Sequence, residues 1–276
     1  MLNTIKTFTL LSVLTGLFLG VGYLFGGIEG AFIALLFAGL LNFISYWHSD
    51  KIILKMYNAK EVKENDNLKL HRMVSRLSER ADIPKPRIYM LDTDNPNAFA
   101  TGRNPENSAV AVTKGIIKHL DKDEIEGVLS HEISHIKNRD TLISTVSATV
   151  AGAVTWIAQI MAYSMLFGGR DRNNVGGGIF MIFFAPLAAS LIRMAISRNR
   201  EFMADESGAK ISKKPESLKS ALRKIHSVAE KRPLDVNPST SHIFIANPLN
   251  MNTVANLFST HPPLEERLKR LSEVNV

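Results

Sequence analysis

The stretch of this sequence that decides the fold is 121-DKDEIEGVLSHEISHIKNRD-140. Asp121 followed by Glu124 is typical of a capping box at a helix start, and Asp123 adds negative charge where the helix dipole favours it. Apolar residues then recur at helical spacing and give one apolar face: Ile125, Val128, Leu129, Ile133 and Ile136. The stretch predicts an amphipathic helix. No helix breaker follows it, which favours one continuous helix into the next apolar region.

Two histidines on this predicted helix, His131 and His135, are four positions apart. This spacing places both imidazoles on one helix face, where both can reach one tetrahedral zinc ion. Glu132 lies beside them and is suited to accept a proton from an attacking water, whose pKa zinc lowers, and to pass it to a leaving amine. The H-E-x-x-H pattern therefore predicts one catalytic Zn²⁺ per chain, with two solvated histidines on a polar face as the alternative.

A catalytic zinc needs a third protein ligand. A third histidine in the same segment would require a glycine at position 138 and a histidine at 141, where this chain has Asn138 and Thr141. We therefore favour Glu201 as the third ligand. Asp205, four residues later, is placed to accept a hydrogen bond from His131, and Asn138 is the other residue expected around the ligands. The rival third ligands are Glu206, His226, His242 and His261.

Four apolar stretches are long enough to cross a bilayer, at about 8–25, 31–47, 141–167 and 179–196. Only the short turn 26–30 separates the first two, and no convincing cleavage site follows, so a helical hairpin is favoured over a signal peptide. Lys and Arg gather at one end of the four stretches. By the positive-inside rule, both termini and the segment 50–140 are expected on the cytoplasmic side.

The predicted fold class is α+β and mainly helical, with four transmembrane helices and a cytoplasmic zincin-like domain that contains a small sheet. The expected parts are a transmembrane hairpin (1–49), the cytoplasmic part with the His131 helix (50–140), a second hairpin (141–197) and a cytoplasmic helical part with the third ligand (198–276). Further helices are predicted at 67–81, 113–120, 200–210, 215–231 and 263–274. Short strands are predicted at 87–91, 98–101 and 109–112, with another considered at 242–246.

The composition of the chain excludes some kinds of metal site and some classes of partner. The chain has 276 residues, a net charge of +7 and no cysteine, which excludes disulfides and zinc sites made of thiolates. The excess positive charge comes without a nucleic-acid-binding signature, so we expect no nucleic acid as a partner. Basic residues beside apolar stretches instead fit contact with the lipid bilayer.

Four motifs together resemble the HtpX-type membrane zinc proteases, prokaryotic relatives of the CAAX prenyl proteases: 131-HEISHIKNRD-140, 201-EFMAD-205, 97-NAFATG-102 and 258-FSTHPPLEER-267. The resemblance covers nearly the whole chain. It implies that His131, His135 and Glu201 bind zinc and that Glu132 is the general base. It also implies an endopeptidase of the prokaryotic cytoplasmic (inner) membrane that cleaves misfolded or damaged membrane proteins under stress, and that cleaves itself. Unfolded or membrane-protein substrates and other quality-control proteases are the implied partners.

Two of these motifs imply further roles. The residues Asn97, Ala98, Phe99 and Ala100 are expected on an edge strand that pairs with an extended substrate, with an ordinary strand as the alternative. His261 and Arg267 are expected near the developing oxyanion, with a Pro-rich turn and a solvated arginine as the alternative.

Two other functions remain open from the sequence. One is a processing protease of the CAAX type, which trims specific lipidated or C-terminal peptides. The other is a non-catalytic membrane scaffold with a structural zinc. Structural zinc sites usually have four protein ligands, and Glu132 would then have no task.

Overall fold

The computed structural model describes residues 2–147, 198–231, 243–245 and 262–276. His242, His261, the expected fourth span and most of the third lie outside these residues. The described chain is mainly helical with one small mixed sheet, as the sequence predicted.

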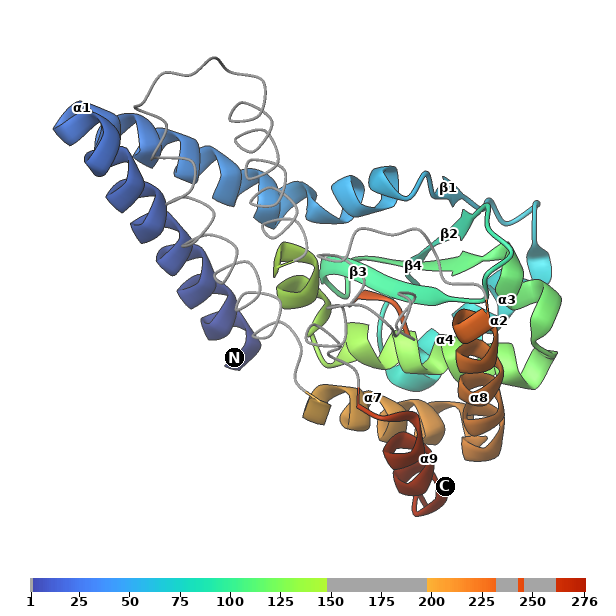
Figure 1. The fold of residues 1–276 in the computed structure, drawn as a ribbon. Coiled ribbons are helices and arrows are strands. Elements are labelled where there is room, and N and C mark those ends of the chain that lie inside the picture. Colours follow the sequence, from blue (N-terminus) through green and yellow to red (C-terminus); the bar gives the residue numbers. More distant parts are fainter. Residues whose placement is uncertain (1, 148–197, 232–242, 246–261) are drawn as a thin grey trace.

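The chain begins with a long helical hairpin. Helix α1 (Leu2–Met56) is interrupted by non-helical backbone at Gly26 and Gly27, and its two legs spread from this bend in a V (Figure 1). The side-chain amide of Asn42 on the second leg donates to Thr15 Oγ1 on the first, at 2.8 Å. Within the described residues, one segment is long and apolar enough to cross a membrane, Gly26–His48, which overlaps the second predicted span. The predicted count of four spans remains a prediction.

A four-stranded sheet follows, in the order β1-β2-β4-β3. Its strands are β1 (Lys60–Glu61), β2 (Arg87–Leu91), β3 (Ala98–Asn104) and β4 (Asn107–Thr113). Strands β3 and β4 form an antiparallel hairpin, whereas β2 pairs with β4 in parallel. Strand β3 therefore lies at one edge of the sheet, and the three predicted strands are confirmed.

Helix α4 (Lys122–Lys137) lies across one face of the sheet and is the centre of the domain (Figure 1). The other helices are α2 (Leu68–Ala81), α3 (Lys114–His119), α7 (Arg198–Ser212), α8 (Pro215–Lys231) and α9 (Leu264–Ser272). The main core joins Val110 and Val112 of the sheet to Val128 and Ile133 of α4. This burial fixes α4, and with it the histidine motif, against strand β3.

Two predictions about local structure are wrong. Helix α4 ends at Lys137, because Asn138 caps it and Arg139 turns the chain with a φ of 55°. It does not continue directly into the helical residues 141–147. The segment 243–245 forms a short helical turn and bend instead of a strand, and it makes one backbone hydrogen bond to β3, from Ile245 N to Ala98 O at 3.0 Å.

Candidate metal centre

Three side chains from two helices converge at the face of α4 that meets α7. His131 Nε2 and His135 Nε2 lie 3.1 Å apart. Glu201 of α7 brings Oε2 to 3.7 Å from His131 Nε2 and Oε1 to 3.6 Å from His135 Nε2. One ligand atom from each residue lies within 4.8 Å of the other two. We call these three residues the metal cluster.

The close approach of α4 and α7 depends on Gly208. A Cβ at this position would lie 2.9 Å from the backbone nitrogen of His131 and 3.0 Å from its Cα. Glu201, Asp205 and Gly208 are spaced by four and three residues, so they share one face of α7. The glycine thus lets that face press against α4 and brings the Glu201 carboxylate to the histidines.

Each histidine is oriented by a carboxylate on its other ring nitrogen. His131 Nδ1 lies 2.9 Å from Asp205 Oδ1, and His135 Nδ1 lies 3.1 Å from Asp140 Oδ2. When each Nδ1 donates its proton to its carboxylate, each Nε2 presents a lone pair toward the other and toward Glu201. Three electron-pair donors that face one point fit a bound cation, and two histidines with one glutamate are a common set for catalytic zinc.

A second layer holds Asp205. Arg267 of α9 is 0% exposed and donates two hydrogen bonds to the Asp205 carboxylate, from Nη2 to Oδ1 at 2.7 Å and from Nε to Oδ2 at 2.8 Å. The structure therefore places Arg267 behind His131 as a buried residue, which excludes the solvated arginine, and its expected role near the oxyanion stays a prediction. Its place on the apolar face of α9, in register with Leu264, Leu268 and Leu271, is the sequence signal that indicates burial.

Glu132 lies in the wall of a small cavity that the metal cluster also lines. The backbone N–H of Ala100 donates to its carboxylate. Burial raises the pKa of Glu132 to about 8, with the Glu201 carboxylate adding to the effect and His135 opposing it. A carboxylate with a raised pKa next to a metal cluster is suited to take and return a proton.

The two histidines differ in their electrostatics. Burial lowers the pKa of His131, and Asp205 only partly offsets this. Burial also acts to lower the pKa of His135, but the carboxylates of Asp140, Glu201 and Glu132 outweigh it and raise that pKa to about 10. His131 is therefore the histidine held neutral without a metal.

Within the described part of the chain, the other residues considered from the sequence, as outer partners or rival ligands, are not part of the metal cluster. Asn138 ends α4 as its C-cap. Among the rival ligands, Glu206 is exposed and pairs with Lys210, and His226 lies on α8 and is not a member of the metal cluster. Sequence reasoning missed Asp140. The signal for it was an acidic residue five positions after His135, at the point where α4 ends.

Of the four residues expected to bind substrate, Asn97 precedes β3, and the other three divide between its two faces, with Ala98 and Ala100 on one and Phe99 on the other. Ala100 lines the cavity beside Glu132. Phe99 points to the opposite face, where it packs with Ile53 and Leu54 of α1. Asn97 is buried, and its side-chain oxygen accepts from the N–H of Ala98 at 3.0 Å.

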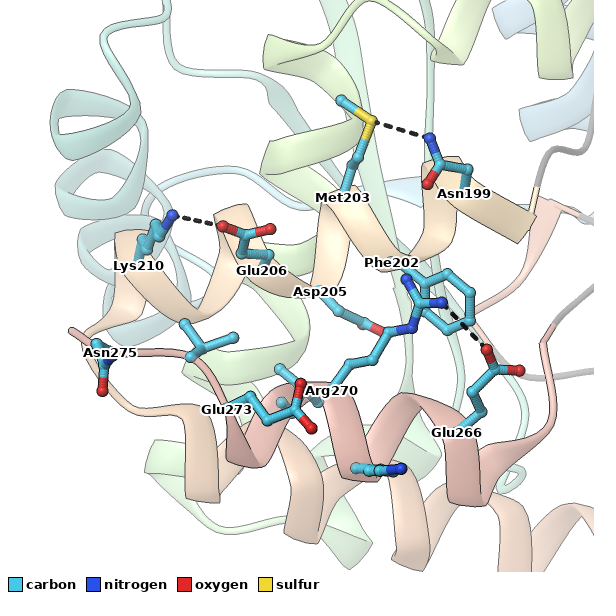
Figure 2. Close-up of a pocket in the computed structure, with 13 residues that line it drawn as sticks. Asn199, Phe202, Met203, Asp205, Glu206, Lys210, Glu266, Arg270, Glu273 and Asn275 are labelled. Carbon is cyan, nitrogen blue, oxygen red and sulfur yellow. Dashed lines mark hydrogen bonds and ion pairs between the residues drawn. The ribbon is translucent and has the colours of Figure 1, made fainter.

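A larger hollow of about 720 Å³ lies between α7 and α9. In it the Arg270 guanidinium lies 3.6 Å from the centre of the Phe202 ring and 3.2 Å from the Glu266 carboxylate (Figure 2). Of the residues that the structure describes, Asp205 lines this hollow but no member of the metal cluster does. It is therefore separate from the site that contains Glu132.

Comparison with known proteins agrees with this geometry. The family "Peptidase family M48" matches residues 64–275. The chain is 51% identical to "Protease HtpX homolog" of Persephonella marina, with 99% of this chain and 98% of that protein covered. The proteins of the same name from Thermococcus kodakarensis (98% and 95% covered) and Burkholderia multivorans (99% and 98%) are each 50% identical.

A solved structure shares the fold. The crystal structure of S. mikatae Ste24p matches 97% of this chain with a TM-score of 0.55 and 19% sequence identity. The chain spans 65% of the length of Ste24p. The relatives, together with the apolar segment Gly26–His48, indicate a membrane protein. The family match and the near-complete relatives show that this chain belongs to peptidase family M48, as a metallopeptidase of the HtpX type.

Proposed function

We propose that this chain is a zinc endopeptidase that cleaves misfolded or damaged membrane proteins, and itself, at the cytoplasmic face of a prokaryotic cytoplasmic membrane. The observation that carries the proposal is the position of Glu132. Its carboxylate lies in the same cavity as the metal cluster and accepts a hydrogen bond from Ala100 on an edge strand. A purely structural metal site has no use for such a carboxylate.

The chemistry follows from the residues in the cavity. His131, His135 and Glu201 would hold the zinc, which when bound polarises the peptide carbonyl and lowers the pKa of the attacking water. Glu132 accepts the proton of that water during attack and delivers it to the leaving amine. Asp205 and Asp140 keep the two imidazoles in the tautomer that directs Nε2 at the metal.

The membrane setting is inferred from the first 56 residues and the charge pattern. The apolar segment Gly26–His48 leads by one helix into the domain that holds the metal cluster. Lys51 and Lys55 follow this segment, so the positive-inside rule puts the domain on the cytoplasmic side. A multi-pass topology with both termini in the cytoplasm extends this reasoning to the remaining predicted spans.

The direct test uses the whole protein purified in detergent, an unfolded model protein as substrate, and metal analysis. Glu132→Gln is expected to keep its zinc and to lose about 10²–10⁴-fold in cleavage rate, including self-cleavage, because only the proton transfer is removed. Undiminished proteolysis in this variant would contradict the proposed role of Glu132 as the general base.

The metal ligand is tested in the same assay. Glu201→Gln is expected to lower the bound zinc sharply, because one of three ligands becomes a neutral amide. Glu206→Gln is the matched control on the same helix, since its side chain is exposed and pairs with Lys210, and it should keep both zinc and activity. Full zinc content in Glu201→Gln would mean that another residue is the third ligand.

A further inference from the structure

The segment 243–245 forms part of the wall of the cavity that contains Glu132. All three of its residues line that cavity, together with the metal cluster, and Phe244 is 1% exposed. The volume of this cavity is about 30 Å³. A space of this size holds roughly one or two water molecules, far less than a peptide. A polypeptide therefore fits beside Glu132 only if the wall of this cavity moves.

The segment is bound to the edge strand through its backbone. The N–H of Ile245 donates to the carbonyl of Ala98 at 3.0 Å, and the carbonyl of Ile245 accepts from Arg267 Nη1 at 3.0 Å. A peptide that adds to a sheet edge makes hydrogen bonds of the first kind. The neighbouring N–H groups of β3 are also satisfied from within the chain, that of Ala98 by Asn97 and that of Ala100 by Glu132.

The side chain of Phe244 fills an aromatic pocket. Its ring meets Tyr57, just after α1, edge-on at 5.1 Å between ring centres. It meets Phe99 of β3 in the same way at 5.3 Å. Edge-to-face pairs at this separation are favourable for aromatic rings. A pocket of this composition, beside the edge strand and next to the catalytic cavity, suits a large apolar side chain.

We infer that the segment 243–245 occupies the substrate position of its own enzyme. Phe244 fills a subsite, formed by Tyr57 and Phe99, that takes an aromatic or other large apolar side chain of an extended peptide. Such a peptide displaces the segment and adds to β3 at Ala98. The inference rests on the proposed function and deepens it, because side chains of this kind become available in extended form when a protein unfolds.

The absence of cysteine from the chain allows a clean test by disulfide. Residues joined by a backbone hydrogen bond across a strand edge lie within the Cα separation that a disulfide needs. Ala98→Cys with Ile245→Cys should therefore lock the segment in place. Asn104→Cys with Asn107→Cys, a register pair at the far end of the β3–β4 hairpin, is the matched control.

The readouts are zinc content and the cleavage rate on an extended peptide that carries one phenylalanine. Oxidation of the Ala98–Ile245 pair is expected to lower the rate by about tenfold or more with zinc unchanged, because apparent affinity scales with the fraction of open molecules. Reduction should restore the rate, and the control pair should not respond. An oxidised pair that cleaves as fast as its reduced form overturns the inference. Failure of the unaltered protein to cleave any polypeptide would instead count against the proposed function.

Removal of the Phe244 ring distinguishes two roles of this residue. Phe244 either occupies a substrate subsite or only packs in the core. Phe244→Ala is expected to lower the KM for the phenylalanine peptide by about threefold or more, because the internal competitor is weakened. Replacement of the phenylalanine in the peptide by alanine should raise KM with the unaltered protein. A core role alone predicts a less stable variant with unchanged KM, and that result would overturn the inference.

Discussion

His131 and His135 lie one turn apart on α4, yet they are held in different ways. The side chain of His131 is 0% exposed, and its carboxylate partner Asp205 comes from α7 and is gripped by Arg267 of α9. The side chain of His135 is 17% exposed, and its partner Asp140 stands five residues further along the chain. One half of the site forms only when three helices assemble, whereas the other half forms locally.

Because of this difference, mutations on the two sides should affect the stability of the fold and the binding of the metal to different degrees. A change on the His131 side disturbs a buried charge pair and the packing of α7 and α9, so it acts on folding as well as on the metal. A change on the His135 side leaves the helix packing intact and acts mainly on the metal. Mutations in each half therefore test whether the two roles are separate.

The largest expected effect is that of Asp205→Asn. It leaves the buried guanidinium of Arg267 without its charge partner, and breaking a buried pair in this way costs about 3–5 kcal/mol of unfolding free energy. Denaturant titration and metal analysis should show both a lower stability and a lower zinc content. Asp123→Asn, in an exposed ion pair with Lys214, is the control and should leave both stability and zinc content nearly unchanged. A variant that loses zinc but keeps full stability would contradict the comparison.

An intermediate effect is expected from Gly208→Ala. The added methyl group meets the backbone of His131, and overpacking of this kind costs about 1–3 kcal/mol. Because α7 must shift away from α4, the Glu201 carboxylate also withdraws from the histidines. Gly127→Ala is the matched control, since its methyl group would meet the backbone of Leu218 on α8 at a similar distance, 2.9 Å. Both variants should lose stability, but only Gly208→Ala should lose zinc affinity in a chelator competition.

The smallest expected effect is that of Asp140→Asn. An amide oxygen still accepts from His135 Nδ1 but without the negative charge, so zinc affinity should fall by about tenfold, the low end for such outer partners. Asp140 is buried, but the amide keeps this hydrogen bond, so the free energy of metal-free unfolding should fall by about 1 kcal/mol, well below the loss expected for Asp205→Asn. A stability loss as large as that of Asp205→Asn would show that the two halves are equivalent.

Local structure was predictable wherever the signal was local. The pattern of apolar residues gave helix α8 and strand β2 with the bounds observed, and the capping box of Asp121 and Glu124 is present at the start of α4. The choice of Glu201 as third ligand, by contrast, rested on the need of a catalytic zinc for a third ligand and on Asp205 four residues later. The helix α8, the strand β2 and the capping box are the local cases. These are features in which a few neighbouring residues determine the backbone.

The features that were not predicted depend on contacts between distant residues. Arg267 is buried because Asp205, 62 positions away in the sequence, accepts two of its hydrogen bonds. The β-prone run at 243–245 does not become a strand, because it meets β3 at a single carbonyl and its aromatic ring packs into a pocket instead. Helix α4 ends at Lys137 without a glycine or proline after it, so the sequence has no helix breaker that predicts the turn at Arg139.

The position of Tyr57 has a mechanical consequence. Within α1 the non-helical backbone is confined to Gly26 and Gly27, so the apolar segment Gly26–His48 and the last turn before Tyr57 belong to one rod. Thirty helical residues extend about 45 Å, and a tilt of about five degrees at one end moves the other by about 4 Å. Such a displacement at Tyr57 is comparable to the separation of its ring from Phe244. A tilt of the apolar helix is thus passed to Tyr57 and, through the ring contact, to the Phe244 side chain that lines the catalytic cavity.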